Sequence, residues 1–359
     1  MKILIMGSRS YPPDIGGIER YVYEFTRVAS RLGHEITLIV QKSPGEKSYE
    51  KNGNIEIIRC SVPKKKPLDR FFMTLNTVLN QCGDFDIYWG HGTPGLMLYH
   101  FKPYVFTIHG FGYMREEDRS DLANELLKWW YSWMLKKPDA NIAVDRLSYE
   151  IAKKIESETY WINNGIGVYR FSRDYPNPYK KNDKRNVLYI GRLIESKGII
   201  DIMDGFENYD DAVLHIVGGG PLKDTVRRRA SDSDGSIVFH GRVETVEEYF
   251  KHADLYVLPS YHEGFPTTVL EAMAARTPTV ITSLPAFDGV FEHGEETMFF
   301  SPGDVDSMME HVRNVFEDER LEQSLIEEGY KKVKKKYSWE VQTRKILKVF
   351  EKVIEGENV

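Results

Sequence analysis

Cysteine is scarce in this chain, which has only Cys60 and Cys82 among its 359 residues. Two isolated cysteines provide neither the close spacing of a zinc site nor the disulfide framework of a small secreted domain. The reducing cytosol is the simplest compartment for such a sequence. We therefore expect a cytoplasmic protein without a cysteine-bound metal or a disulfide framework.

Long apolar runs are also lacking. The apolar start, Met1–Met6, is too short for a signal peptide, and no stretch approaches the roughly 20 residues that span a bilayer. We expect a soluble protein that at most contacts the inner face of a membrane. The basic and aromatic segment 63–72 and the aromatic segment 129–133 would suit such peripheral contact, although a solvated loop and a packed helix are the favoured explanation.

Positive charge is not in excess. The chain has 48 Lys and Arg against 54 Asp and Glu, a net charge of −6, so no basic field indicates a nucleic acid partner. The hydrophobic fraction of 41% is ordinary for a globular protein. A length of 359 residues exceeds one typical core and predicts two domains.

Short apolar segments alternate with amphipathic helical patterns along nearly the whole chain, which predicts parallel sheets built from β-α-β units. In the first half we expect strands at 2–6, 35–40, 54–59, 86–89, 104–109, 140–144 and 159–162. The alternation restarts after a turn-rich passage at 170–178, with strands expected at 186–190, 212–217, 236–239, 255–258, 279–282 and 298–300. We therefore predict an α/β protein with two Rossmann-like domains, 1–168 and 169–339. Ligands of such sheets bind at the carboxyl ends of the strands.

The segment 260–278 carries the most chemical information. Glu263 and Glu271, separated by seven residues, flank a Gly-Phe-Pro turn and the start of a helix expected at 267–276. A helix N-terminus presents free N–H groups that can hold a phosphate. Between the two glutamates lie the other candidate donor-binding residues: Gly264, Phe265, Pro266, Thr267 and Thr268. Carboxylates, hydroxyls and phosphate donors in one segment suit a sugar nucleotide.

Other candidate residues follow expected strands. Arg192 and Lys197 come after the strand at 186–190, and fixed positive charge there suits a diphosphate. Gly16 and Gly17 follow the first strand and would let the backbone approach a ligand, although a tight turn also explains them. His109 ends the strand at 104–109, where a structural histidine is the alternative, and His91 at a neighbouring strand end is the second candidate.

These motifs together resemble the retaining glycosyltransferases of family four, the group 1 or glycogen-synthase-like enzymes with the GT-B fold. The stretch Glu263–Glu271 is similar to their Glu-x7-Glu motif, and Gly191–Gly198 to their Gly-Arg-(x)n-Lys-Gly element. Gly16–Arg20 resembles their Gly-Gly-x-Glu-Arg loop. The resemblance covers both predicted domains, and its most specific motifs lie in the second.

The resemblance implies a role for each motif. Glu263 and the amides of 264–266 would bind the donor sugar, and Glu271 would accept hydrogen bonds from both ribose hydroxyls. Arg192 and Lys197 would bind the diphosphate.

The resemblance also concerns the first domain. The loop of Gly16 and Gly17 would lie against the donor phosphates, and His109 would meet the transferred sugar. The two domains would face each other across a cleft, and the last helix, 340–359, would pack back onto the first domain.

Two positions depart from the family pattern. Gly167 stands where the family has an acid after Asn-Gly-Ile, and Gly219 stands at an often acidic position of a Gly-x-Gly-Pro turn. Asp-x-Asp pairs, which hold a metal in GT-A enzymes, occur at 84–86, 232–234 and 304–306. Turn and helix-capping roles are sufficient for them, so we expect no metal and no cofactor.

The sequence therefore predicts a retaining, metal-independent hexosyltransferase of glycan biosynthesis that works by front-face displacement. A UDP-sugar is the favoured donor, with GDP- and ADP-sugars as alternatives, and the acceptor is a glycan, a lipid-linked molecule or a small molecule. The competing functions are a nucleotide-sugar epimerase, a sugar phosphorylase and a non-catalytic sugar-nucleotide-binding protein.

Overall fold

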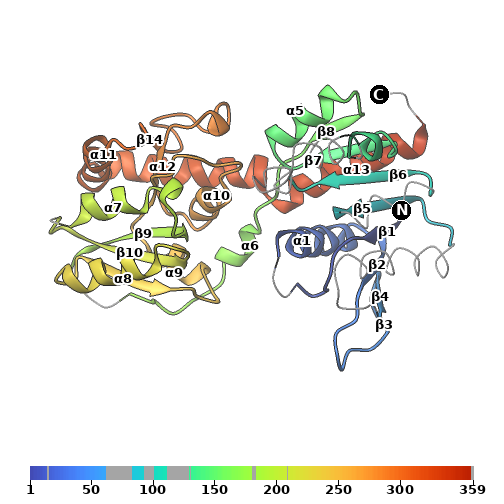
Figure 1. Cartoon of the computed structure of the whole chain (residues 1–359), viewed down its shortest axis with the longest axis horizontal. Coiled ribbons are helices and arrows are strands. Elements are labelled where there is room, and N and C mark those ends of the chain that lie inside the picture. Colours follow the sequence, from blue (N-terminus) through green and yellow to red (C-terminus); the bar gives the residue numbers. More distant parts are fainter. Residues whose placement is uncertain are drawn as a thin grey trace. The chain divides into compact units, whose positions relative to one another are not determined.

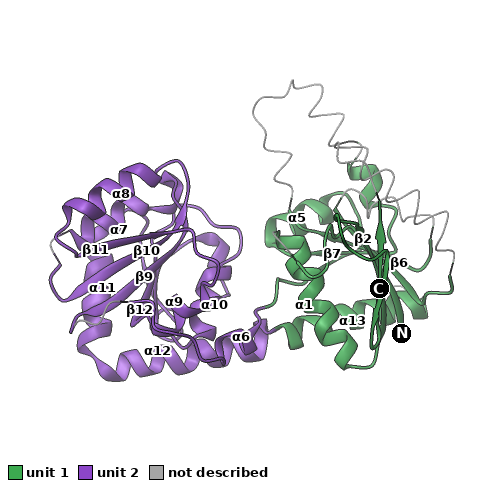
Figure 2. Cartoon of the chain, turned by 90° about the horizontal axis from the view of Figure 1, so that it is seen from below, with its two compact units in different colours: residues 1–165, 339–359 green, residues 166–338 purple. Residues whose placement is uncertain are grey.

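The computed structural model of the chain describes residues 1–13, 16–61, 83–92, 101–110, 129, 131–179, 183–207 and 209–356. They form two compact units (Figure 2). Unit 1 comprises Met1–Gly165 and Trp339–Val359, and unit 2 comprises Ile166–Ser338. The chain thus enters unit 2 once and returns once.

Unit 1 is built on an eight-stranded sheet with the order β3-β4-β2-β1-β5-β6-β7-β8, labelled in Figure 1. All of its pairings are parallel except that of β3 with β4. Its strands are β1 (Lys2–Met6), β2 (Glu35–Gln41), β3 (Tyr49–Asn52), β4 (Ile55–Cys60), β5 (Ile87–His91), β6 (Tyr104–Ile108), β7 (Ala140–Ala143) and β8 (Thr159–Trp161). The described helices are α1 (Gly17–Arg31), α5 (Arg146–Lys154) and α13 (Trp339–Glu355).

The returning helix α13 belongs to the core of unit 1. Phe350 is fully buried and its ring lies 6.0 Å from Phe25 of α1 and 5.2 Å from Trp89 of β5. Aromatic rings at these separations combine large apolar burial with favourable edge-to-face contacts. The last helix therefore packs on the domain in which the chain begins.

Unit 2 contains a six-stranded, wholly parallel sheet with the order β11-β10-β9-β12-β13-β14. Its strands are β9 (Arg185–Arg192), β10 (Ala212–Gly219), β11 (Ile237–Gly241), β12 (Leu255–Leu258), β13 (Thr279–Thr282) and β14 (Met298–Phe300). Its helices are α6 (Val168–Phe171), η3 (Glu195–Lys197), α7 (Ile199–Phe206), α8 (Lys223–Asp232), α9 (Glu247–His252), α10 (Thr267–Ala274), η4 (Pro285–Phe287), α11 (Val305–Glu317), α12 (Glu319–Lys332) and η5 (Val333–Tyr337). Strand order reverses between β9 and β12, and in open α/β sheets such a switch point is the usual ligand site.

The predicted α/β fold class is confirmed, because both units consist of helices around mainly parallel sheets. Strands β12, β13 and β14 have the predicted bounds. The sequence reading missed β3, whose four residues are all exposed and lack an apolar side chain facing the core. An edge strand of this kind carries no hydrophobic signal.

Two chain segments run side by side where the chain passes between the units. Within unit 2, Ile166 N donates to Tyr337 O at 2.7 Å, and Ile166 forms an isolated parallel bridge with Ser338. Within unit 1, Gly165 packs so tightly on Trp339 that an added Cβ would lie 2.6 Å from a ring carbon. The turn-rich passage 170–178 lies inside unit 2.

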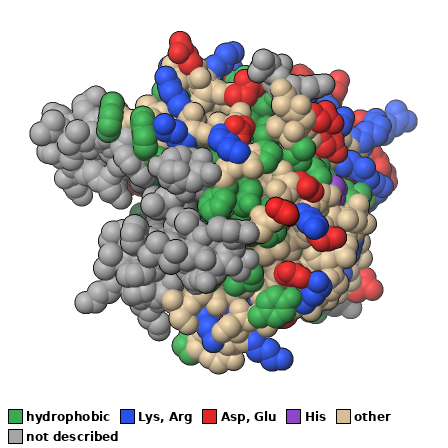
Figure 3. Space-filling view, turned by 90° about the vertical axis from the view of Figure 1, so that its right-hand side faces the viewer, with side chains coloured by type: hydrophobic (Ala, Val, Ile, Leu, Met, Phe, Trp, Pro, Cys, Tyr) green, Lys and Arg blue, Asp and Glu red, His purple; other side chains and the backbone are tan. Residues whose placement is uncertain are grey.

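Among the described helices, none combines the length and the apolar character that crossing a bilayer requires. On the face drawn in Figure 3, basic and acidic side chains of the described residues are interspersed. That mixture is in keeping with the small net charge of −6.

Candidate functional site

The sequence motifs of unit 2 lie at the switch point of its sheet. Arg192 ends β9 and is followed directly by η3, which contains Lys197. The loop 259–266 follows the neighbouring strand β12 and leads into α10. Parallel strands end at the same edge, so both motifs converge there.

An ion pair joins the two loops. Lys197 Nζ lies 2.6 Å from Glu263 Oε1, and it also donates to the backbone carbonyl of His262 at 3.2 Å. Ser260 Oγ donates to the same glutamate oxygen at 2.7 Å. The two charged side chains are only 21% and 14% exposed, so solvent screens this pair less than a surface pair.

The loops also approach closely through their backbones. Tyr261 N donates to Ser196 O at 3.0 Å, and Gly198 adopts φ 62° against Pro259. A Cβ at Gly198 would lie 2.0 Å from the Pro259 carbonyl oxygen, so only glycine fits without displacement. This glycine therefore fixes how near Lys197 comes to Glu263.

The start of α10 offers a fixed set of donors. Pro266 is the N-cap residue and Thr267 N donates to Phe265 O at 2.9 Å. The hydroxyl of Thr268 accepts a hydrogen bond from Tyr256 at 2.8 Å. Burial raises the pKa of Tyr256, so this phenol stays protonated and keeps the threonine in place. N–H groups of the first helical turn have no intrahelical acceptor and can bind an anion.

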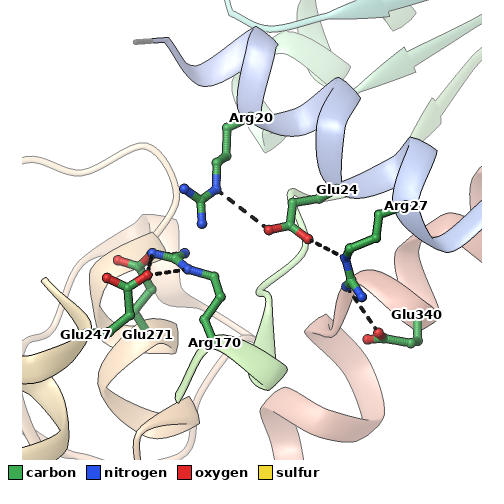
Figure 4. A network of polar contacts seen from close by, with 7 residues as sticks. All are labelled: Arg20, Glu24, Arg27, Arg170, Glu247, Glu271 and Glu340. Atoms are coloured by element: carbon green, nitrogen blue, oxygen red, sulfur yellow. Dashed lines mark hydrogen bonds and ion pairs between the residues drawn. The ribbon is translucent and has the colours of Figure 1, made fainter. Parts of the chain in front are cut away.

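Glu271 lies on α10 in a network that the sequence analysis missed (Figure 4). Arg170 of α6 contacts Glu271 Oε1 at 3.2 Å through Nη1, and it is ion-paired with Glu247 at the start of α9. The three side chains are 12% to 15% exposed. Arg170 was assigned only to a turn-rich passage, since nothing in the local sequence indicates its distant partners.

Arg192 is exposed at the end of β9, and its carbonyl accepts a hydrogen bond from Tyr189 at 3.1 Å. Arg242, just after β11, is a second cation at the same edge. A Cβ at Gly219 would lie 2.7 Å from Arg242 Nε. The sequence analysis did not single out this guanidinium.

In unit 1 the two predicted glycines lie at the start of helix α1. Gly16 is the N-cap residue of α1, with φ 143°, and the Glu19 carboxylate folds back toward it and accepts a hydrogen bond from Arg9 N at 3.4 Å. Gly17 begins the helix, and a Cβ there would meet no described atom within 4 Å. Farther along α1, Glu24 pairs with Arg20 and Arg27, and Arg27 in turn with Glu340, as Figure 4 shows.

His109, which is half-buried, lies against the second candidate, the fully buried His91. The Nδ1 atom of His91 lies 2.9 Å from Nε2 of His109, and the ring of Tyr21 packs edge-on against His109 at 4.9 Å. Burial lowers the pKa of His109 to about 3, and burial followed by the neighbouring imidazole lowers that of His91. Both rings are therefore neutral near pH 7, and one donates a hydrogen bond to the other.

The structure thus brings Lys197, Glu263 and Ser260 together in unit 2, and His91 and His109 together in unit 1. The roles assigned to the site residues by the family resemblance remain predictions. No group of three His, Cys, Asp or Glu side chains suited to a metal ion occurs in the described ranges. Asp304 caps α11 by accepting from Ser307 N at 3.0 Å, as its helix-start position predicts.

The candidate membrane-contact segments are only partly described. Residues 63–72 lie outside the described residues. Trp129 and Trp133 are 67% and 42% exposed, and Lys137 Nζ lies 4.5 Å from the Trp133 ring centroid. Contact of these exposed rings with a membrane remains a prediction.

Comparison with protein families gives two matches that divide the chain. Residues 15–170 match the model described as Glycosyltransferase Family 4, and residues 172–332 match the model of group 1 glycosyl transferases. Only Phe171, the last residue of α6, lies between the two matches, and Arg170 is the last residue of the first one.

Similar curated proteins include glycosyltransferases from several bacteria. A phosphatidyl-myo-inositol mannosyltransferase of Mycolicibacterium smegmatis is 25% identical over 367 residues, covering 94% of this chain and 90% of that protein. A Bacillus subtilis glycosyltransferase with a provisional teichuronic acid biosynthesis name is 31% identical over 198 residues, or 53% of this chain. That match spans about half the relative's length, 49%.

Similar solved structures cover nearly the whole chain. A sucrose-phosphate synthase from Thermosynechococcus elongatus has a TM-score of 0.76 at 17% identity, covering 99% of this chain and 100% of that chain. Anabaena Alr3699/HepE in complex with UDP-glucose has a TM-score of 0.70 at 14% identity, covering 98% and 99%. At these identities the likeness concerns the fold alone.

Proposed function

We propose, on the premise that the chain belongs to the group 1 glycosyltransferases with the GT-B fold, that it transfers a sugar from a nucleoside diphosphate with retention at the anomeric carbon. The observation that carries the proposal is the contact of Lys197 with Glu263 at the switch point of unit 2. In this contact, the lysine supplies a cation that can bind a diphosphate, and the glutamate supplies a carboxylate that can bind sugar hydroxyls. Membership of the family supports transfer chemistry, and the site supports the donor class.

The leaving diphosphate would be held by fixed positive charge. The ammonium of Lys197 has three N–H donors, and Glu263 and the His262 carbonyl take two of them. The third suits a phosphate oxygen. Arg192 and the first-turn N–H groups of α10 would add further donors where negative charge develops in the transition state. Removing one such donor typically costs about 10²- to 10³-fold in rate.

The two glutamates would act as hydrogen-bond acceptors rather than as bases. Glu263, held by Ser260 and Lys197, would bind sugar hydroxyls, and Glu271 would bind the ribose. Both carboxylates are already engaged by cations, Lys197 and Arg170. Neither therefore resembles a carboxylate nucleophile of a two-step retaining glycosidase.

We propose a front-face displacement. The bond between the anomeric carbon and the departing phosphate oxygen breaks while the acceptor oxygen bonds to the same face of that carbon. The acceptor proton passes to the departing phosphate oxygen, so no protein base is needed. His109, neutral near pH 7, would contribute hydrogen bonding to the transferred sugar and not charge. We expect no metal requirement, since Lys197, Arg192 and α10 supply the electrostatic stabilisation.

The favoured donor is a UDP-sugar, because Alr3699/HepE, whose fold this chain shares, is described in complex with UDP-glucose. The relative named as a phosphatidyl-myo-inositol mannosyltransferase supports a lipid-linked acceptor, and glycan and small-molecule acceptors remain open. A cytoplasmic location, with contact at the inner membrane face through residues such as Trp129, is part of this proposal.

Thermal unfolding with UDP, GDP, ADP and their sugars tests the donor site first. A ligand at about 100 times its dissociation constant stabilises the protein by about 2.7 kcal/mol. Transfer is then measured with the best-binding sugar nucleotide, with and without a chelator, and the anomeric configuration of the product is read by NMR. Retention and insensitivity to the chelator are expected, whereas an inverted product would overturn the retaining assignment.

The same assay separates the competing functions. A transferase releases nucleoside diphosphate in proportion to acceptor, whereas an epimerase converts the sugar nucleotide without acceptor and a phosphorylase consumes phosphate. Donor binding without turnover over a broad acceptor panel would indicate a non-catalytic binding protein.

A further inference from the structure

Arg170 is a largely buried cation held between two carboxylates. Its Nε atom lies 2.5 Å from Glu247 Oε1 and its Nη1 atom 3.2 Å from Glu271 Oε1. The arginine side chain is 14% exposed. In Figure 4 dashed lines join the guanidinium to both glutamates. Such a planar group fixes the direction of the carboxylates that it contacts.

The arginine is itself held in place from several sides. Its amide donates to Gly167 O at 2.9 Å, and its carbonyl accepts from the Tyr175 hydroxyl at 3.0 Å. The next residue, Phe171, is buried, and the guanidinium carbon lies 5.5 Å from its ring centroid. The guanidinium is therefore preorganised before any ligand arrives.

The contact leaves Glu271 able to bind a ligand. A carboxylate has about four acceptor positions, and the hydrogen bond from Arg170 Nη1 to Oε1 of Glu271 occupies one of them. Two ribose hydroxyls can therefore bind to the same carboxylate while the arginine stays in place. A cation on one side and hydroxyls on the other would hold the carboxylate in one orientation.

We propose that Arg170 is the positioning residue that orients Glu271 toward both ribose hydroxyls of the donor, with Glu247 holding the arginine from the other side. The inference rests on the proposed function, in which Glu271 binds the ribose. It gives the segment through which the chain enters unit 2 a part in nucleotide recognition. A purely structural ion pair would stabilise unit 2 without affecting the preference of the protein for nucleotides that carry both ribose hydroxyls.

The test compares nucleotides with and without ribose hydroxyls. Dissociation constants are measured by titration calorimetry for UDP and 2′,3′-dideoxy-UDP, with the GDP and ADP pairs run alongside, and the pair that wild type binds most tightly is used. Wild type should prefer the ribose form at least about tenfold, the contribution of one hydrogen bond to a charged group. In Arg170→Met this preference should fall to about threefold or less, with Arg170→Lys in between.

Matched variants locate the effect. Glu271→Gln should reduce the preference, and adding Arg170→Met to it should change the preference no further, since the two residues act through one carboxylate. Arg185→Met removes another arginine that bridges two carboxylates, at the opposite end of β9, and should retain the wild-type preference. If Arg170→Met fails to fold, the ribose preference of Arg170→Lys is used instead.

The outcomes separate the two proposals. Equal weakening of both nucleotides in the Arg170 variants, with the ribose preference intact, would overturn the positioning role and leave the proposed function standing. A wild-type protein that binds the ribose and dideoxy forms equally would overturn the ribose role of Glu271 and, with it, the positioning role of Arg170. Failure of wild type to bind any of the nucleotides would overturn the proposed function as well.

Discussion

Lys197 and Glu263 come from different loops of unit 2, yet Nζ of the lysine lies 2.6 Å from Oε1 of the glutamate. Ser260 binds the same oxygen at 2.7 Å. The site thus holds its cation with a carboxylate and a hydroxyl before any substrate arrives. A preorganised cation needs little rearrangement as charge builds on a leaving diphosphate.

The first prediction concerns this lysine. Lys197→Met should lower kcat by about 10²- to 10³-fold, because it removes one donor from the leaving group. Lys331→Met is the matched control, since Lys331 forms an exposed pair with Glu328 on α12 and surface pairs contribute little. Activity is followed as nucleoside diphosphate released with acceptor.

Measuring the free energy of unfolding separates two roles of Lys197: binding the leaving group and neutralising the Glu263 carboxylate. Lys197→Met leaves the partly buried Glu263 carboxylate without its cation, which destabilises the fold. Adding Glu263→Gln should recover part of that loss without restoring transfer. Near-normal transfer by the single variant would contradict the role assigned to the ammonium group.

How much of this site follows from the sequence depends on the range of each interaction. Strand β12 and the start of α10 were predictable, because a buried apolar run and a Gly-Phe-Pro turn are local signals. Arg170 was not, since its partners lie 77 and 101 residues farther along the chain. Only the fold brings such side chains together.

The histidine pairs illustrate the same limit. His91 and His109 were each placed at a strand end from the sequence, which the parallel order of β5 and β6 then makes neighbours. Their mutual hydrogen bond at 2.9 Å depends on ring orientation, which no local pattern encodes. The pairing of His215 with His240 at 3.0 Å gave no signal in the sequence at all.

A second prediction concerns the pH dependence of transfer. Because burial lowers the pKa of His109 to about 3, the imidazole is neutral at pH 6 and at pH 8 alike. The kcat/KM profile should therefore show no acidic limb from this residue near the ordinary histidine pKa of about 6.5. His109→Gln should lower kcat across the profile without changing its shape between pH 6 and 8. An acidic limb near 6.5 in wild type that His109→Gln abolishes would contradict this assignment.

A third prediction concerns stability and the second histidine pair. Burial, followed by the charge of His240, lowers the pKa of His215 to about 3, and burial also lowers that of His240. In the unfolded chain both titrate near 6.5, so below that pH the unfolded state binds more protons, and for His215 this difference extends down to about pH 3. The stabilising effect of the neutral rings is complete above pH 6.5 and is lost as pH falls.

This loss of unfolding free energy can be measured by urea unfolding at pH 7.5, 6.0 and 5.0. His215 should contribute a slope of up to about 1.4 kcal/mol per pH unit within that window, and the more exposed His240 a smaller one. His215→Asn should flatten the dependence for unit 2, whereas the wild-type slope persisting in this variant would assign it to other groups. A probe in each unit is needed, because two compact units need not unfold together.

The last prediction tests whether the backbone sets the distance between Lys197 and its glutamate. Gly198 has φ 62°, and an added Cβ would lie 2.0 Å from the Pro259 carbonyl oxygen. Gly198→Ala must therefore move the loop after β12 away from η3. We expect weaker nucleotide binding and a lower midpoint of thermal unfolding, by more than the roughly 2–4 °C that corresponds to 1 kcal/mol in a domain of this size.

Gly235→Ala is the control for backbone strain alone, since Gly235 also has a positive φ of 88° but nothing lies within 4 Å of the added Cβ. It should reduce the free energy of unfolding by the cost of the left-handed conformation, about 1 kcal/mol, and so lower the midpoint slightly. It should leave nucleotide affinity unchanged. Equal effects of the two substitutions on affinity would show that strain, and not the approach of the two loops, matters. A loss of affinity confined to Gly198→Ala would instead tie nucleotide binding to the distance between the Lys197 and Glu263 loops.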